Sequence, residues 1–118
     1  MTMSRGRQFT KPGAPLTAPV FYILLSLSIR DRHGYDILRH VDESSEGRIR
    51  LGPATLYTTL KRLLEAGLVI ELEADPKEDP RRRNYRLTRS GRTELTSELE
   101  RMKQAILLAG THGARARS

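Results

Sequence analysis

The fold is decided by residues 53–88, which read PATLYTTLKRLLEAGLVIELEADPKEDPRRRNYRLT. Apolar side chains in the first part of this stretch recur at the spacing of one helical face: Leu56, Leu60, Leu63 and Leu64. That spacing predicts an amphipathic helix over residues 52–66. Pro53 suits the first turn of such a helix, and Gly67 suits the left-handed cap that ends it.

Two strands are predicted after this helix, at residues 68–73 and 84–88. In the first strand, alternate apolar side chains are expected to face the core: Leu68, Ile70 and Leu72. In the second strand, Tyr85 and Leu87 share a face. Residues 74–83 hold two prolines and charges of both signs, which is typical of a long hairpin tip. Helix, glycine stop and basic hairpin, in this order, predict a winged helix-turn-helix.

The rest of the chain completes a mainly α fold with this small β-hairpin. A first helix is expected from about Thr17, and a second follows a turn at residues 31–34. Residues 48–51 are expected to form a short strand that pairs with the hairpin. A last helix begins after Thr88 and is expected to stop at Gly110. The predicted fold is a three-helix core with a wing and a C-terminal dimerisation helix.

The chain divides into four predicted segments. Residues 1–15 are a flexible basic N-terminal arm, because their prolines, glycines and cations cannot build a packed core. Residues 16–88 are the winged-helix domain, and residues 89–110 are the C-terminal dimerisation helix. Residues 111–118 are polar and are expected to be a disordered tail.

Composition narrows the class of protein. The chain has 118 residues, enough for one domain, and a formal net charge of +7, which favours a polyanionic partner such as nucleic acid. It has no cysteine, which excludes disulfides and thiolate chemistry. The apolar run at residues 20–27 is too short to cross a bilayer, and the N-terminal residues do not resemble a secretory signal. We expect a cytoplasmic, nucleoid-associated protein with no membrane partner.

The helix over residues 52–66 offers a candidate DNA-reading face. At 100° per residue, the side opposite the leucines carries small residues, hydroxyls and two cations: Ala54, Thr55, Thr58, Lys61 and Arg62. Tyr57 and Thr59 lie on the two flanks. Small side chains let a helix enter the major groove, and arginine can read guanine with two hydrogen bonds. The alternative is an ordinary solvated helix face.

The hairpin adds a second candidate contact with nucleic acid. Four arginines lie at the start of its return strand: Arg81, Arg82, Arg83 and Arg86. Alternation places Arg82 and Arg86 on the face opposite Tyr85. Such a cluster can neutralise DNA phosphates, although a solvated group of charges is the alternative. A helix and a basic wing in this order are more specific than either feature alone.

The last helix carries an apolar seam at heptad spacing: Leu95, Leu99, Met102 and Ile106. The seam could pack on its own domain, but the other helices and the hairpin already supply a small core. We therefore expect a homodimer, whose two recognition helices would read a palindromic DNA site. The three histidines are scattered, and we find no catalytic constellation, metal site or cofactor motif, so we expect no enzyme and no cofactor.

The chain contains several short motifs in a fixed order: ILL at 23–25, HGYDI at 33–37, TLY at 55–57, LKRL at 60–63, AGLV at 66–69 and RRNYRLT at 82–88. In this combination the chain resembles the PadR family of bacterial transcriptional regulators, over residues 16–109. The length of the last helix resembles the compact subgroup with a single C-terminal helix.

The resemblance implies a winged-helix dimer that represses transcription by occupying a promoter operator. Tyr57 and its neighbours are implied to meet DNA, and the arginines before Tyr85 to belong to the wing. Phe21 and Tyr22 of the first helix are implied to assist the last helix at the dimer interface. Some relatives bind flat aromatic or phenolic effectors there, so a small-molecule effector is implied as a further partner.

Two other functions compete with a repressor. A winged helix can serve as a protein-interaction module, which would favour a neutral or acidic recognition face. A nonspecific architectural nucleic-acid binder would use the same cations without sequence preference. The exposed cations of the predicted helix and wing favour DNA, and sequence preference distinguishes a repressor from an architectural binder.

Overall fold

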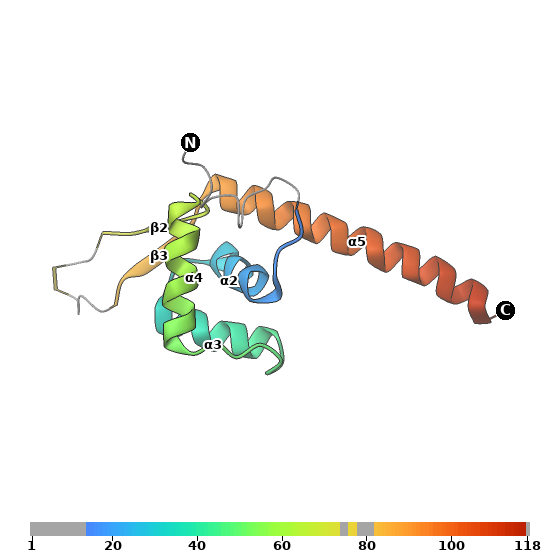
Figure 1. Ribbon diagram of the computed structural model, residues 1–118, viewed down its shortest axis with the longest axis horizontal. Helices are drawn as coiled ribbons and strands as arrows, with labels where there is room; N and C mark the ends of the chain where they lie inside the picture. The colour runs from blue at the N-terminus through green and yellow to red at the C-terminus, as the bar shows by residue number, and fades with distance from the viewer. Residues whose placement is uncertain (1–13, 74–75, 78–81, 118) are drawn as a thin grey trace.

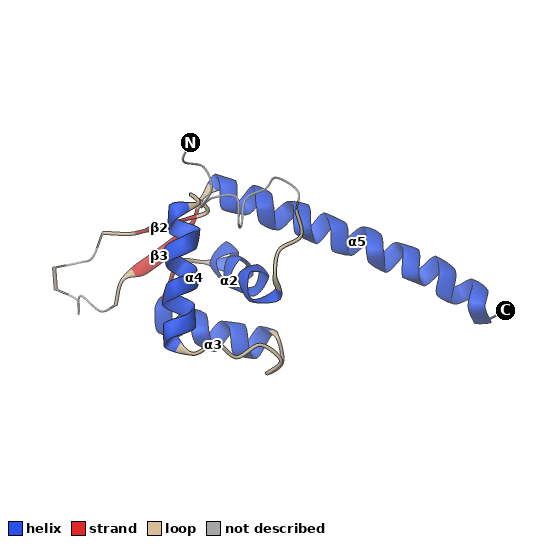
Figure 2. Cartoon of the chain, viewed as in Figure 1, coloured by secondary structure: helices blue, strands red, loops and turns tan. Residues whose placement is uncertain are grey.

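The computed structural model describes residues 14–73, 76–77 and 82–117, which form four helices and a three-stranded sheet (Figures 1 and 2). In chain order, the elements are α2 (Ala18–Ile29), β1 (Arg32–His33), α3 (Gly34–Ser44), α4 (Pro53–Glu65), β2 (Val69–Glu71), β3 (Asn84–Leu87) and α5 (Arg89–Arg117). The first three helices gather beside the sheet, and α5 extends away from them (Figure 1). This arrangement confirms the predicted winged helix-turn-helix.

The centre of the fold is α2, which contacts α3, α5 and β3. Thr17 caps its start by accepting a hydrogen bond from the backbone of Val20, and proline lies in its first turn. Five of its apolar side chains are buried: Val20, Phe21, Ile23, Leu24 and Leu27. Apolar residues lie around most of the helix because neighbours cover it on several sides.

The helix predicted over residues 52–66 is confirmed as α4. Leu56, Leu60 and Leu63 are at most 1% exposed, so the leucine stripe faces the core as its spacing indicates. Gly67 has a φ of 78°, the left-handed conformation that ends a helix. The backbone of Leu68 then donates to the carbonyl of Leu63 at 3.0 Å, which turns the chain into the hairpin.

The sheet has the order β1-β3-β2, with both pairs antiparallel. The prediction that residues 48–51 supply the third strand is wrong, because Arg32 and His33 pair with β3 instead. Residues 48–51 follow a local turn in which the amide of Ile49 bonds to Ser45 Oγ at 2.9 Å. Arg32 is fixed to the end of α2, since its Nε donates to the carbonyl of Ser26 at 2.8 Å.

The inward face of β2 also differs from the prediction. Val69 is 1% exposed, whereas Ile70 is 44% exposed, so the expected core position of Ile70 is wrong. The difference arises at the junction with α4, where Leu68 is buried before the strand begins. Because side chains alternate along a strand, this one-residue offset turns Ile70 outward. On β3, Tyr85 and Leu87 are both buried, as predicted.

The start of α5 is locked to the end of α4 by Thr88 and Gly91. Thr88 Oγ1 donates to the carbonyl of Gly67 at 2.7 Å and accepts from the amide of Gly91 at 3.0 Å. The amide of Thr88 donates to the carbonyl of Leu68 at 3.0 Å. Gly91 packs directly against that same carbonyl, so the helix can approach the hairpin only where a side chain is missing.

Gly91→Ala is therefore expected to lower the free energy of unfolding by about 1–3 kcal/mol. The added Cβ would lie 2.6 Å from Leu87 Cδ1 and would press on the backbone carbonyl of Leu68. Urea unfolding followed by circular dichroism measures the loss. Gly110→Ala is the matched control, because nothing lies within 4 Å of its Cβ position, and alanine there should stabilise the helix. Equal effects of the two substitutions would contradict this account.

The far end of α5 is longer than expected. Gly110 was predicted to stop the helix, but the helix continues to Arg117. Gly110 does not adopt the positive φ of a cap, and the alanines and arginines that follow it favour helix. Every side chain from residue 99 to residue 111 is exposed, so this part of α5 projects free of the domain. None of the described helices is long and apolar enough to cross a bilayer.

Candidate nucleic-acid interface

One side of α4 is exposed along its whole length. The exposed side chains are Ala54, Thr55, Thr58, Lys61 and Arg62, which we call the α4 face. Thr59 is half-buried, and its hydroxyl donates to the carbonyl of Thr55 at 2.8 Å. A shallow depression runs over this side, lined in part by Thr58 and Arg62. The predicted face is therefore exposed, with small residues and hydroxyls toward its N-terminal end and two consecutive cations, Lys61 and Arg62, in its C-terminal half.

The first turn of α4 is open to an anion. Gly52 precedes the helix and contributes no side-chain hydrogen bond to cap it. The amides of the first turn therefore keep their partial positive charge on the surface. Ala54 and Thr55 at this end are exposed, so a DNA strand can approach without a steric barrier.

Tyr57, on the flank of the α4 face, has a structural contact that the sequence did not reveal. Its ring lies over Gly34 at the start of α3, where an added Cβ would be 2.8 Å from Tyr57 Cζ. The side chain is still 45% exposed. Tyr57 therefore joins α4 to α3 while keeping part of its ring on the surface. The HGY and TLY motifs are the two sides of this contact.

Two arginines of the wing, Arg83 and Arg86, are paired with carboxylates. Arg86 donates two hydrogen bonds to Asp31, at 3.1 and 2.8 Å, and Arg83 contacts Glu71. The hydrogen bond to Asp31 raises the pKa of Arg86 above its ordinary value. Both guanidinium groups remain more than half exposed. In the absence of DNA, the carboxylates hold these two arginines in place. A DNA phosphate would compete with a carboxylate for each arginine.

The remaining wing predictions are met in part. Arg82 is exposed, and Arg86 lies on the face opposite the buried Tyr85, as alternation predicts. Arg81 lies outside the described residues. Neither Asp31 nor Glu71 was predicted to restrain the wing. Asp31 lies 55 residues from Arg86 in the chain, so no local pattern connects the two. The acidic character of Asp31 and Glu71 was the only sequence signal for these pairs.

A buried ion pair fixes β1, the strand that pairs with β3 of the wing. Arg32 is 5% exposed, and its Nη1 lies 3.2 Å from a carboxylate oxygen of Asp36. Arg30 and Arg39 approach the same carboxylate, at 3.1 and 3.2 Å. Burial alone would raise the pKa of Asp36, but the hydrogen bonds and charges of these arginines outweigh it and lower that pKa. The pair fixes β1 to α3, and β1 in turn holds β3 of the wing.

The predicted dimer residues fall into two groups. Phe21 and Leu95 are buried in the domain's own core, with 8% and 3% exposure, and Tyr22 is half-buried beside them. Leu99, Met102 and Ile106 are exposed on the projecting part of α5. The heptad seam thus begins as core packing and continues as an exposed apolar stripe, which Leu107 and Leu108 widen.

This fold, with an exposed small-residue helix beside an arginine-bearing wing, defines the class of winged-helix DNA-binding proteins. The family model described as "Transcriptional regulator PadR-like family" matches residues 23–97. The chain belongs to this PadR-like family of transcriptional regulators, and it is a DNA-binding regulator and not an enzyme.

Known relatives are distant in sequence but similar in fold. A protein of Lysinibacillus sphaericus named "Uncharacterized protein X" is 28% identical over 88 residues, which are 71% of this chain and 81% of that protein. A PadR family transcription regulator from Clostridium difficile has a TM-score of 0.68 at 21% identity, over 81% of this chain and 98% of that one.

A third relative was solved with DNA. The structure of Bacillus subtilis PadR in complex with operator DNA has a TM-score of 0.62 at 25% identity. The match covers 70% of this chain and 47% of that chain, so the present chain spans about half of the longer regulator.

Proposed function

We propose that the protein is a homodimeric repressor that occupies a palindromic promoter operator. The observation that carries this proposal is the exposed α4 face, which joins small residues, hydroxyls and Arg62 on one side of a helix. The wing would lie along the DNA backbone, with Arg82, Arg83 and Arg86 near phosphates. Solved with its operator, the Bacillus subtilis relative supports this use of the fold. Such a protein would act on chromosomal DNA in the cytoplasm.

The proposed dimer forms through the projecting part of α5. From residue 99 to residue 111 this helix is exposed on all sides, and an isolated helix of such length is only marginally stable in water. A second copy of the chain would cover the stripe of Leu99, Met102 and Ile106. The two-fold dimer would then carry two equivalent α4 faces, one from each copy. Palindromic recognition follows from that symmetry.

A small-molecule effector fits this arrangement as a releasing signal. Tyr22 is half-buried on α2, which contacts α5 near the proposed dimer interface. The ring centroid of Tyr22 lies 5.2 Å from that of Phe21. A flat aromatic ligand beside Tyr22 would shift α5 and change the spacing of the two α4 faces. Titrating phenolic acids into a protein–DNA complex tests this step. Unchanged operator affinity with every compound would leave a constitutive repressor.

The central experiment is fluorescence anisotropy with the duplex upstream of the protein's own gene and a shuffled duplex. A preference of about three orders of magnitude or more for the upstream duplex is expected of an autoregulatory repressor. Similar, salt-sensitive affinity for both duplexes would favour an architectural binder. No binding to either would favour a protein-interaction module.

Arg62→Ala is expected to weaken binding to the upstream duplex by about a hundredfold or more, because a bidentate arginine–base contact provides about 1–3 kcal/mol of discrimination and the proposed dimer makes it twice. Binding to the shuffled duplex should change much less, since that contact depends on sequence. Arg92→Gln at the root of α5 is the control, with the same loss of charge away from the α4 face and from the proposed dimer interface. Equal losses on both duplexes would show that Arg62 does not read bases.

A further inference from the structure

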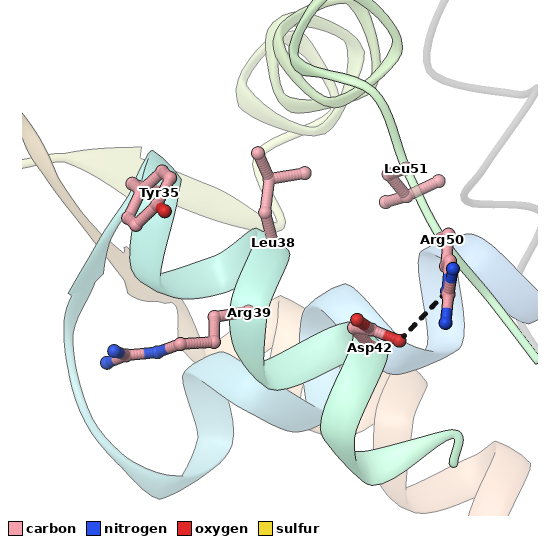
Figure 3. A pocket seen from close by; sticks show the side chains of 6 residues that line it. All are labelled: Tyr35, Leu38, Arg39, Asp42, Arg50 and Leu51. Atoms are coloured by element: carbon pink, nitrogen blue, oxygen red, sulfur yellow. Dashed lines mark ion pairs between the residues drawn. The ribbon is translucent and has the colours of Figure 1, made fainter. Parts of the chain in front are cut away.

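An open groove lies between α3 and the segment that leads into α4 (Figure 3). We call it the α3–α4 groove, and its lining residues are Tyr35, Leu38, Arg39, Asp42, Arg50 and Leu51. None of these residues belongs to the predicted DNA-binding set. Leu38 and Leu51 are partly buried and form an apolar floor, while the polar side chains stand at its rim.

The groove is continuous with the surface proposed to meet DNA. Tyr35 follows Gly34, the residue under the ring of Tyr57 from α4. At the other end, Arg50 precedes Gly52, the N-cap of α4, by two residues, a distance of at most about 7 Å along the chain. The rim at Tyr35 thus begins beside Tyr57, on the flank of the α4 face. The rim at Arg50 begins beside the first turn of α4.

The rim presents hydrogen-bond donors to the solvent. Arg50 and Arg39 are 77% and 62% exposed, and Tyr35 is 71% exposed, an unusual exposure for an aromatic side chain. Arg39 Nη2 lies 3.2 Å from Asp36, and Arg50 Nε lies 3.4 Å from Asp42 across the groove (Figure 3). The long contact at Nε leaves the terminal nitrogens of Arg50 to bind an anion from solution.

We propose that the α3–α4 groove binds the sugar–phosphate backbone of one operator strand. Arg50 and Tyr35 donate to phosphate oxygens at its two ends, and the leucine floor accommodates a deoxyribose between them. Asp42 orients Arg50 in the free protein and yields to the phosphate, since exposed ion pairs exchange readily. This inference rests on the proposed function and adds a contact outside the helix and wing.

A backbone contact has a signature that a base contact lacks. Phosphates are present on every duplex, so losing such a contact weakens operator and shuffled duplexes by the same factor. Each phosphate neutralised by a cation also adds about −0.9 to the slope of log K against log salt. Because the proposed dimer would carry this contact in each protomer, removing it makes the slope less negative by about 1.8.

The test compares wild type, Arg50→Gln and Tyr35→Phe on both duplexes between 50 and 200 mM salt. Because both protomers lose the contact, Arg50→Gln should weaken both duplexes by about a hundredfold at the low salt, with a deficit about tenfold smaller at the high salt. Tyr35→Phe should weaken both by a few-fold without changing the slope, because it removes a hydroxyl and no charge. Arg92→Gln is the charge-matched control, because Arg92 is an exposed cation at the root of α5, outside the α4 face, the groove and the projecting part of that helix, and it should leave affinity and slope unchanged.

The outcomes separate this inference from the proposed function. Operator preference in wild type, together with an unchanged slope in Arg50→Gln, overturns the groove contact and leaves the repressor intact. A loss confined to the upstream duplex also overturns it, since that marks base reading. Absence of any duplex binding by wild type overturns both. Parallel losses on the two duplexes with the reduced slope support the groove contact.

Discussion

Asp36→Ala is expected to lower the free energy of unfolding by about 3–5 kcal/mol, because it leaves a buried arginine without its counter-ion. Arg32 is 5% exposed and cannot move its guanidinium into water without breaking the 2.8 Å bond to the carbonyl of Ser26. That bond and the pair with Asp36 together hold β1 against α2 and α3. Urea unfolding followed by circular dichroism at neutral pH gives the loss directly.

The exposed pair of Asp42 and Arg50 supplies the control. Asp42→Ala removes an ion pair whose partners are 46% and 77% exposed, so the expected change is at most about 1 kcal/mol. If Asp36→Ala were no more harmful than Asp42→Ala, the buried pair would not be the element that fixes β1.

The effect of Asp36 should also depend on pH in a definite direction. The surrounding arginines lower the pKa of the folded carboxyl below its ordinary value of 3.8, although burial opposes them. A lowered folded pKa means that the stabilisation is complete above the unfolded pKa and is lost as pH falls through the folded pKa. The difference between wild type and Asp36→Ala should therefore be constant from neutral pH to about pH 5, and should shrink in stronger acid.

The elements that sequence predicted well depend on local periodicity. The buried stripe of α4, the glycine cap at Gly67 and the shared face of Tyr85 and Leu87 each follow from side-chain spacing within one element. β1 has two residues and no periodicity of its own, so only its pairing with β3 reveals it. The predicted core position of Ile70 was wrong because the junction with α4 determines which side chains of β2 face the core. The alternation of apolar residues alone does not determine this.

The same distinction holds for the candidate site. The exposure of Thr58 and Arg62 follows from helical geometry, and it was predicted. The contact between Tyr57 and Gly34 and the pairing of Arg86 with Asp31 join residues from different elements. No spacing rule connects such positions in a single sequence. The predictable part of the interface is thus its outward face, and the unpredicted part is the set of contacts that orients it.

Ile106→Glu is expected to raise the dissociation constant of the dimer by about a thousandfold or more. Ile106 is 70% exposed in the single chain, so the charge costs the folded monomer little, but a dimer would bury an unpaired carboxylate. Because the proposed dimer would be two-fold symmetric, it would contain this carboxylate twice, and each 1.4 kcal/mol of cost is about tenfold in affinity. Analytical ultracentrifugation measures the shift, and Gln104→Glu, about 200° away around the helix, is the charge-matched control.

Loss of the dimer should also remove most of the operator affinity. A monomer presents one α4 face, so it gains contacts with only one half-site, and we expect anisotropy to show binding weaker by about a hundredfold or more. The winged-helix domain itself should remain folded, because Leu95 anchors the root of α5 in the core and is 3% exposed. A variant that stays dimeric would show that the stripe on α5 is not the interface. A monomeric variant that binds the operator as tightly as wild type would show that dimerisation is not needed for recognition.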